Sequence, residues 1–245
     1  MRALLMTKKK QPTKWGPLCF TAETAGVTIK IAKSGGPTAV SLETSTDWNN
    51  WRAYTINNLV ILANIWDKVY FRNTSETDTG FSTNVSTAYY YFIIQNGQAA
   101  CSWDVTYLLN KNGTTTLSNN CFGRLFYQCT NLTACPELPA TTLANNCYHS
   151  MFYGCSGLKT LPKLPAITMT SKCYYYMFHN CSQIKLSTTQ TWEYQTPYRI
   201  PLEWTWTTAS DWSVAMFYGT WWTYTWSSTW NLTINTTYYT SNTVV

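Results

Sequence analysis

The segment 117–184 repeats itself with a period of 26 residues. Five apolar or cysteine positions recur in three copies: Leu117, Cys121, Phe126, Cys129 and Leu132, then Leu143, Cys147, Phe152, Cys155 and Leu158, then Met169, Cys173, Phe178, Cys181 and Ile184. The linker repeats too, since residues 136–140 (PELPA) return as residues 162–166 (PKLPA). A fixed period of this length is typical of chains that stack one structural unit per repeat. The repeat therefore predicts a stack of coils with equivalent side chains above one another.

Within one repeat, the sequence favours two kinds of local structure. Residues 143–155 (LANNCYHSMFYGC) carry apolar residues about four positions apart, which fits a short helix. Gly154 stands near its end, where a left-handed cap is expected. Residues 158–166 contain two prolines and are expected to be extended. Each coil is thus predicted to pair a helical turn with an extended segment, as leucine-rich repeats do. The predicted buried core of the coils consists of Leu117, Cys121, Phe126, Cys129, Leu143, Cys147, Phe152, Cys155, Cys173, Phe178 and Cys181.

The rest of the chain divides by composition. Residues 1–16 form a basic arm, and residues 17–108 contain short alternating strands at intervals of about ten residues, which is typical of a β-sandwich. Repeats occupy residues 109–190. Residues 191–245 are interpreted as an insertion, a degenerate last repeat and a cap, because residues 207–220 (TTASDWSVAMFYGT) resemble residues 142–155. The expected fold class is mixed β and α/β: a β-sandwich-like domain followed by a short repeat solenoid.

Charge is scarce and unevenly distributed. Charged residues make up 11% of the chain, against about 25% in ordinary globular domains, a composition that suits β-rich extracellular or virion proteins. Much of the net charge of +6 comes from the arm, which has five cations and no acid. We expect a solvated arm or one that docks the protein to a partner through Lys8, Lys9, Lys10 and Lys14, and nucleic-acid binding is not favoured. No apolar stretch is long enough to span a membrane, and the first residues do not match a signal peptide.

Nine cysteines are present, and six occupy repeat positions. The repeat places Cys121, Cys147 and Cys173 in one column and the other three in a second. Small cysteine side chains pack well in a narrow core, so reduced packing thiols are expected. Disulfides remain an alternative. A zinc site is the less favoured one, because no CxxC pair exists. We therefore expect no metal and no cofactor.

Few residues suit catalysis. His149 and His179 are the only histidines, and no phosphate-binding loop, HExxH or GxSxG motif is present. His149 with Cys147 forms a conceivable nucleophile pair. Two acid pairs, Glu137 with Glu203 and Asp47 with Asp67, are conceivable only if the fold brings them together. The sequence favours a protein that is not an enzyme.

Tyrosines on the repeats are the candidate binding residues. Tyr148, Tyr153, Tyr174 and Tyr175 fall between the core positions and vary in place from copy to copy. An exposed tyrosine-rich face suits contacts with carbohydrate or protein. Ordinary partial burial is the alternative interpretation.

Tryptophan is abundant in unusual places. Thirteen are present, and many stand beside Asp, Asn, Ser or Thr in turn contexts where glycine is expected. One interpretation is an exposed aromatic platform. The other is that these positions are recoded UGA codons whose natural residue is glycine. It concerns Trp48, Trp66, Trp103, Trp192, Trp204, Trp206, Trp212, Trp221, Trp222, Trp226 and Trp230.

The repeat text, residues 151–158 (MFYGCSGL) with residues 164–168 (LPAIT), resembles BspA-like leucine-rich repeats of gut Bacteroidales and their phages, including crAss-like phages. Residues 17–23 and 69–74 look like the β-domain that precedes such repeats. The resemblance implies surface recognition without catalysis. It implies a virion surface protein, as a capsid or tail decoration or fibre, that attaches to a host-surface glycan or protein and forms a homo-oligomer such as a trimer. A cell-surface adhesin of the bacterial host is the alternative.

Overall fold

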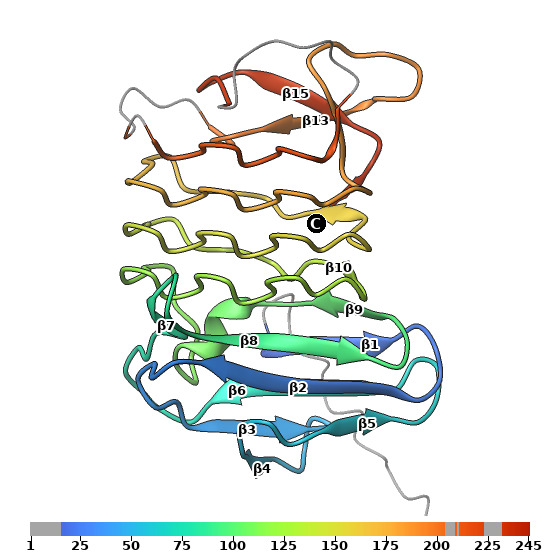
Figure 1. Cartoon of the computed structure of the whole chain (residues 1–245), viewed down its shortest axis with the longest axis vertical. Coiled ribbons are helices and arrows are strands. Elements are labelled where there is room, and N and C mark those ends of the chain that lie inside the picture. The colour runs from blue at the N-terminus through green and yellow to red at the C-terminus, as the bar shows by residue number, and fades with distance from the viewer. Residues whose placement is uncertain (1–15, 204–208, 210, 223–231) are drawn as a thin grey trace, which may run out of the picture.

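The computed structural model describes residues 16–203, 209, 211–222 and 232–245. This part of the chain is β-rich (Figure 1). Its first half contains β1 (Leu18–Ala22), β2 (Val27–Ser34), β3 (Leu42–Ser45), β4 (Arg52–Tyr54), β5 (Val60–Leu62), β6 (Lys68–Asn73), β7 (Ser82–Asn84), β8 (Ala88–Gln95), β9 (Ala99–Ser102) and the 3₁₀ helix η1 (Val105–Leu108). The second half contains β10 (Leu132–Ala134), β11 (Thr160–Leu161), β12 (Lys185–Ser187), β13 (Thr196–Arg199), β14 (Trp221–Trp222), β15 (Thr237–Thr240) and β16 (Thr243–Val244).

Two sheets form the N-terminal part. One has the order β10-β9-β1-β6-β3-β4 and the other β5-β2-β8-β7. Side chains of β2 alternate between buried and partly exposed, so one face of that sheet lies on the core. Phe20 of β1 and Phe92 of β8 meet between the sheets with ring centroids 4.8 Å apart. The two sheets therefore share one apolar interior.

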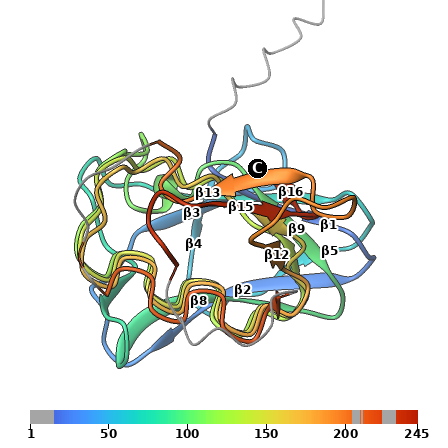
Figure 2. The same cartoon turned by 90° about the horizontal axis from the view of Figure 1, so that it is seen from above.

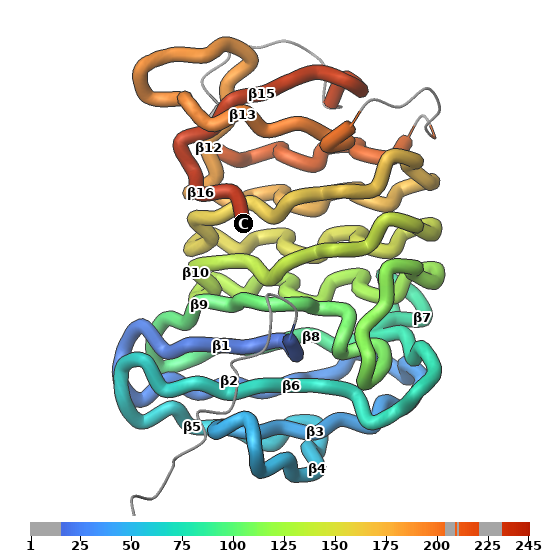
Figure 3. The backbone as a smooth tube through the Cα atoms, turned by 180° about the vertical axis from the view of Figure 1, so that it is seen from behind, coloured from blue at the N-terminus to red at the C-terminus, as the bar shows by residue number. Residues whose placement is uncertain are grey.

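Stacked coils continue from this part (Figures 1 and 3). Seen from above, their turns follow nearly the same path (Figure 2). The ring of Phe126 in the first coil lies on Phe92 of β8, with centroids 5.4 Å apart and planes at 16°. One cluster of buried residues runs without a break from Leu18 to Tyr238. No break in the buried core coincides with the predicted domain boundaries after residues 108 and 190. These boundaries therefore stay a prediction.

The predicted helix in each coil is wrong. Residues 143–155 contain turns and no helix, and the described residues hold no α-helix at all, so the α/β part of the expected fold class is not supported. The spacing that suggested a helix has another cause. Every fourth residue takes a left-handed backbone conformation, which returns apolar side chains to the core at nearly helical intervals.

The last part of the chain closes one side of the coils. A four-stranded sheet has the order β13-β15-β12-β14, and β16 pairs in parallel with β11. Asn242 joins two coils here: its side-chain amide donates to the carbonyls of Lys159 at 2.9 Å and Gln183 at 3.0 Å, and its Oδ1 accepts from the backbone N–H of Lys185 at 2.7 Å. The C-terminal segment therefore links neighbouring coils through hydrogen bonds.

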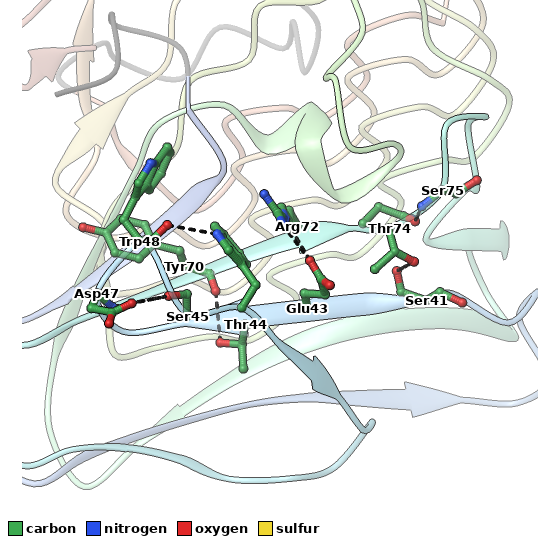
Figure 4. A network of polar contacts seen from close by, with 12 residues as sticks. Ser41, Glu43, Thr44, Ser45, Asp47, Trp48, Tyr70, Arg72, Thr74 and Ser75 are labelled. Carbon is green, nitrogen blue, oxygen red and sulfur yellow. Dashed lines mark hydrogen bonds and ion pairs between the residues drawn. The ribbon is translucent and has the colours of Figure 1, made fainter. Parts of the chain in front are cut away.

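Three of the tryptophans that stand where glycine is expected have a backbone conformation that favours glycine. Trp48, Trp66 and Trp103 have φ of 68°, 73° and 68°, in the left-handed region. Figure 4 shows Trp48 after Asp47, whose carboxylate accepts from the hydroxyl of Ser45 at 3.0 Å. Turn chemistry predicted this conformation at these three sites. Trp192 is exposed and Trp212 buried. Trp221 and Trp222 form β14, and Trp204, Trp206, Trp226 and Trp230 lie outside the described residues.

Candidate binding face

The coils are built from four-residue turns. Left-handed residues recur at intervals of four within a coil and at intervals of 26 between the three complete coils: Asn120, Arg124 and Gln128, then Asn146, Ser150 and Gly154, then Lys172, Tyr176 and Asn180. Ala215 and Gly219 continue the series in the fourth coil. Asn and Gly tolerate this conformation, whereas nothing in the side chains of Arg124 or Tyr176 favours it. The neighbouring coils must therefore hold it in place.

Hydrogen bonds alternate between two directions. The N–H of Phe152 donates to the carbonyl of Met177 in the next coil at 2.9 Å. The N–H of the next residue, Tyr153, turns back to Ser150 of its own coil at 3.1 Å. The same alternation runs through the first three coils. Each coil thus pairs along its length with the coil above, which fixes the side chains of successive coils in register.

The inner side chains form ring columns. Phe126, Phe152, Phe178 and Phe217 stack with centroids 5.3, 5.3 and 5.1 Å apart and planes within 10° of parallel. Phe122, Tyr148 and Tyr174 form a second column at 5.9 and 5.8 Å. All eleven predicted core residues are buried.

A third column lies on the outside. We call Tyr127, Tyr153, His179 and Tyr218 the ring ladder. Their successive centroids are 5.1, 4.6 and 4.8 Å apart, and the first two pairs of rings are stacked. Tyr218 is 47% exposed, and the other three are partly exposed. Because each inner ring has a neighbour on both faces, the ladder presents ring edges and tyrosine hydroxyls to solvent. A ligand that needs a free aromatic face finds none in the middle of the ladder.

An arginine and a histidine lie beside the ladder. The guanidinium of Arg124 lies 4.8 Å from the ring centroid of Tyr127 and 5.1 Å from that of Tyr89. His149 stacks on Tyr175 with centroids 4.9 Å apart, and its Nδ1 lies 3.0 Å from the hydroxyl of Ser150. Burial, with smaller effects from Arg124 and then Lys172, lowers the pKa of His149 to about 4. His149 is therefore neutral at pH 7 and accepts or donates hydrogen bonds without charge.

The structure separates the four predicted binding tyrosines. Tyr153 and Tyr175 are partly exposed on the turns. Tyr148 and Tyr174 are 1% and 0% exposed, so placing them on the exposed face was wrong. Their rings occupy the second inner column, because two adjacent residues of each four-residue turn, such as Cys147 and Tyr148, are buried. Tyr127, Tyr176, His179 and Tyr218 were missed, although the 26-residue period, extended from Tyr153, leads to Tyr127 and His179. The docking lysines, Lys8, Lys9, Lys10 and Lys14, lie outside the described residues.

The cysteines and two of the paired acids were the other candidates for chemistry in the sequence. All nine cysteines are buried and free, and burial raises the pKa of Cys129, Cys135 and Cys173 to about 12. Asp47 and Asp67 each accept backbone N–H groups within their own turns. Within the described ranges, no three His, Cys, Asp or Glu side chains are grouped as metal ligands would be.

Among the described residues, no helix has the length and apolar character needed to cross a membrane. Comparison with known proteins found no matching family model, no matching curated protein and no matching solved structure.

Proposed function

We propose that this chain is a non-enzymatic recognition protein on the surface of a phage particle, as a capsid or tail decoration or fibre. It holds a short leucine-rich-repeat-like solenoid outward to contact a glycan or protein on the host cell. The ring ladder carries the proposal, because it places partly exposed tyrosine edges in register along a rigid stack. Tyrosine offers contact area at small entropic cost, and its hydroxyl both donates and accepts hydrogen bonds.

The composition and the resemblance of the repeats to BspA-like sequences support the same function. A surface poor in charge and rich in Thr, Ser, Asn and Tyr suits a protein that works outside the cytosol. The basic arm would dock to other virion proteins, and a homo-oligomer would multiply weak contacts. A bacterial adhesin would use the ladder in the same way. Purified phage particles that contain the chain would favour the first location, and bacterial envelopes that contain it would favour the second.

The test uses hydroxyl removal with the stacking kept. Fluorescently labelled protein is incubated with intact gut Bacteroidales cells, and bound fluorescence is compared with that of the combined Tyr127→Phe, Tyr153→Phe and Tyr218→Phe variant. We expect binding to weaken by about tenfold or more, since each of the three lost hydrogen bonds contributes roughly 0.5–1.5 kcal/mol. Tyr239→Phe, on β15 and away from the ladder, is the matched control and should bind as the parent does. Equal binding by the parent, the combined variant and the control would contradict a role for the ring ladder in cell binding.

A further inference from the structure

The turn halves of the three complete coils carry positive charge and no acid. We call their exposed side chains, within residues 119–130, 145–156 and 171–182, the turn face. These segments contain two cations, Arg124 and Lys172, and neither Asp nor Glu. In the fourth coil Asp211 is present, and its carboxylate accepts a hydrogen bond from the hydroxyl of Ser171 at 2.9 Å. The three turn segments therefore contribute only positive charge, and the carboxylate of Asp211 borders them at Ser171.

Arg124 has no carboxylate partner among the described residues, whose ion pairs are Arg72–Glu43, Lys111–Glu76 and Lys185–Glu193. Its guanidinium lies against two tyrosine rings, and one terminal nitrogen donates to the hydroxyl of Tyr89 at 3.2 Å. Its Nε is buried without a hydrogen-bond partner. The side chain as a whole is partly exposed, so its guanidinium can still receive an anion from solvent, and charge-assisted hydrogen bonds of this kind are strong.

Lys172 completes the pair from the third coil. It is exposed, and its Nζ lies 5.8 Å from the ring centroid of Tyr175, which in turn stacks on His149. The backbone N–H of Arg124 donates to the carbonyl of His149 at 2.9 Å, and Lys172 lies against the ring on which His149 stacks. His149 therefore lies in the coil between those that hold the two cations.

We propose that the turn face binds an acidic polysaccharide, whose carboxylate or sulfate groups lie between Arg124 and Lys172 beside His149. The site deepens, and so rests on, the proposed role in host-surface attachment. Sugar hydroxyls would meet the amide and hydroxyl side chains that line the same turns, which include the exposed Asn119, Gln128, Asn145, Asn180 and Ser182.

The chemistry of the turn face favours this ligand over two others. A neutral glycan held by ring stacking along the ladder needs free aromatic faces, and those of the two inner rings, Tyr153 and His179, are covered by neighbouring rings. A nucleic acid carries a phosphate at every nucleotide and is held by many cations, whereas this face has two. An acidic polysaccharide combines widely spaced charges with many hydroxyls, as this face requires.

The first experiment compares two polymers with the same backbone. Immobilised dextran sulfate of low sulfate content, whose charges are widely spaced, should retain the protein at low salt, and unsulfated dextran should not. Arg124→Gln with Lys172→Gln should weaken retention by about tenfold, as expected for two charge contacts on an exposed surface. Lys159→Gln with Lys163→Gln removes the same charge from exposed linker positions and should leave retention unchanged. Equal weakening by both pairs would mean general attraction to a basic protein and would overturn the site.

The second experiment reads the site in the unmodified protein. The chain has two histidines, so the ring protons of His149 and His179 are assigned by one substitution. Inorganic sulfate bound between the cations should raise the pKa of His149 by about half a unit or more, because a nearby anion favours the charged imidazolium. His179, whose pKa is lowered by burial alone, should not respond. A constant pKa of His149 at saturating sulfate, or an equal change at both histidines, would contradict the proposal.

Failure of the site and failure of the function give different results. Cell binding that depends on the ladder hydroxyls but not on Arg124 and Lys172 would support the proposed function. It would contradict the proposal that the turn face binds an acidic polysaccharide. Binding to dextran sulfate that depends on Arg124 and Lys172, without any binding to cells, would support the anion site. It would contradict the proposed attachment to host cells.

Discussion

The ring of Phe126 lies parallel to that of Phe152, with planes 2° apart and centroids at 5.3 Å, although 26 residues separate them in the chain. Phe178 and Phe217 extend the same column. This regularity follows from the backbone hydrogen bonds between coils, which place equivalent residues of successive coils directly above one another. The phenylalanine column fills the interior of the coils, and the ring ladder lies on the outer surface of the same coils.

Phe152→Ala should destabilise the protein strongly. Phe152 is 0% exposed and has a ring above and below it, so truncation opens a cavity that rigid coils cannot close. We expect a loss of about 3–5 kcal/mol in the free energy of unfolding, measured by chemical denaturation. Tyr153→Ala, one residue later on the outer ladder, should cost about 1 kcal/mol. Similar losses for the two variants would contradict the inward and outward assignment.

Trp66→Gly should stabilise the protein. Trp66 has φ of 73° and is 74% exposed, so its side chain contributes little packing to offset a strained backbone. Relief of this strain contributes about 1 kcal/mol. Trp66→Ala is the matched control, because it removes the indole and keeps the strain. A glycine variant no more stable than the alanine variant would show that the left-handed conformation costs nothing there. Mass measurement of the proteolytic peptide that contains position 66 in the natural protein separately tests whether glycine occupies it.

His149 should make stability depend on pH. Its pKa is about 4 in the folded protein and 6.5 when unfolded, so the unfolded chain binds more protons between these values. Stability from this group is present above pH 6.5 and is lost as pH falls towards 4, by up to about 3 kcal/mol. Burial raises the pKa of Asp104 to about 6, which makes stability fall as pH rises through part of the same window. The measurement is therefore the difference in slope between the parent and His149→Asn, followed by denaturation at several pH values. An unchanged slope would contradict the burial of His149.

All nine thiols should resist modification while the protein is folded. They are buried, and the thiolate form is disfavoured by desolvation. A thiol-specific disulfide reagent at pH 8 should label the native protein far more slowly than the denatured chain, in which nine groups react. Rapid labelling of several groups in the native state would show that the cysteine columns are open.

The sequence predicted the columns but not the path of the chain. Equal spacing of Cys121, Cys147 and Cys173 specifies that they belong to equivalent positions, whatever the local conformation. The choice between a helix and a series of turns depends on where alternate N–H groups bond, and the acceptors for Phe152 and Tyr148 lie in the next coil. Tyr148 and Tyr153 look alike in sequence, yet one points inward and the other outward. Glycine-like turns were recognisable at Trp48, Trp66 and Trp103 because their polar neighbours signal turns.

Scalar coupling across hydrogen bonds tests the central claim most directly, since the ring ladder and the turn face exist only if the coils stack as described. In the isotope-labelled protein, the amide nitrogen of Phe152 should couple to the carbonyl carbon of Met177, and that of Phe126 to Met151. Coupling of Phe152 to the carbonyl of Tyr148 instead would indicate a helix, and it would contradict the stack and the binding face built on it.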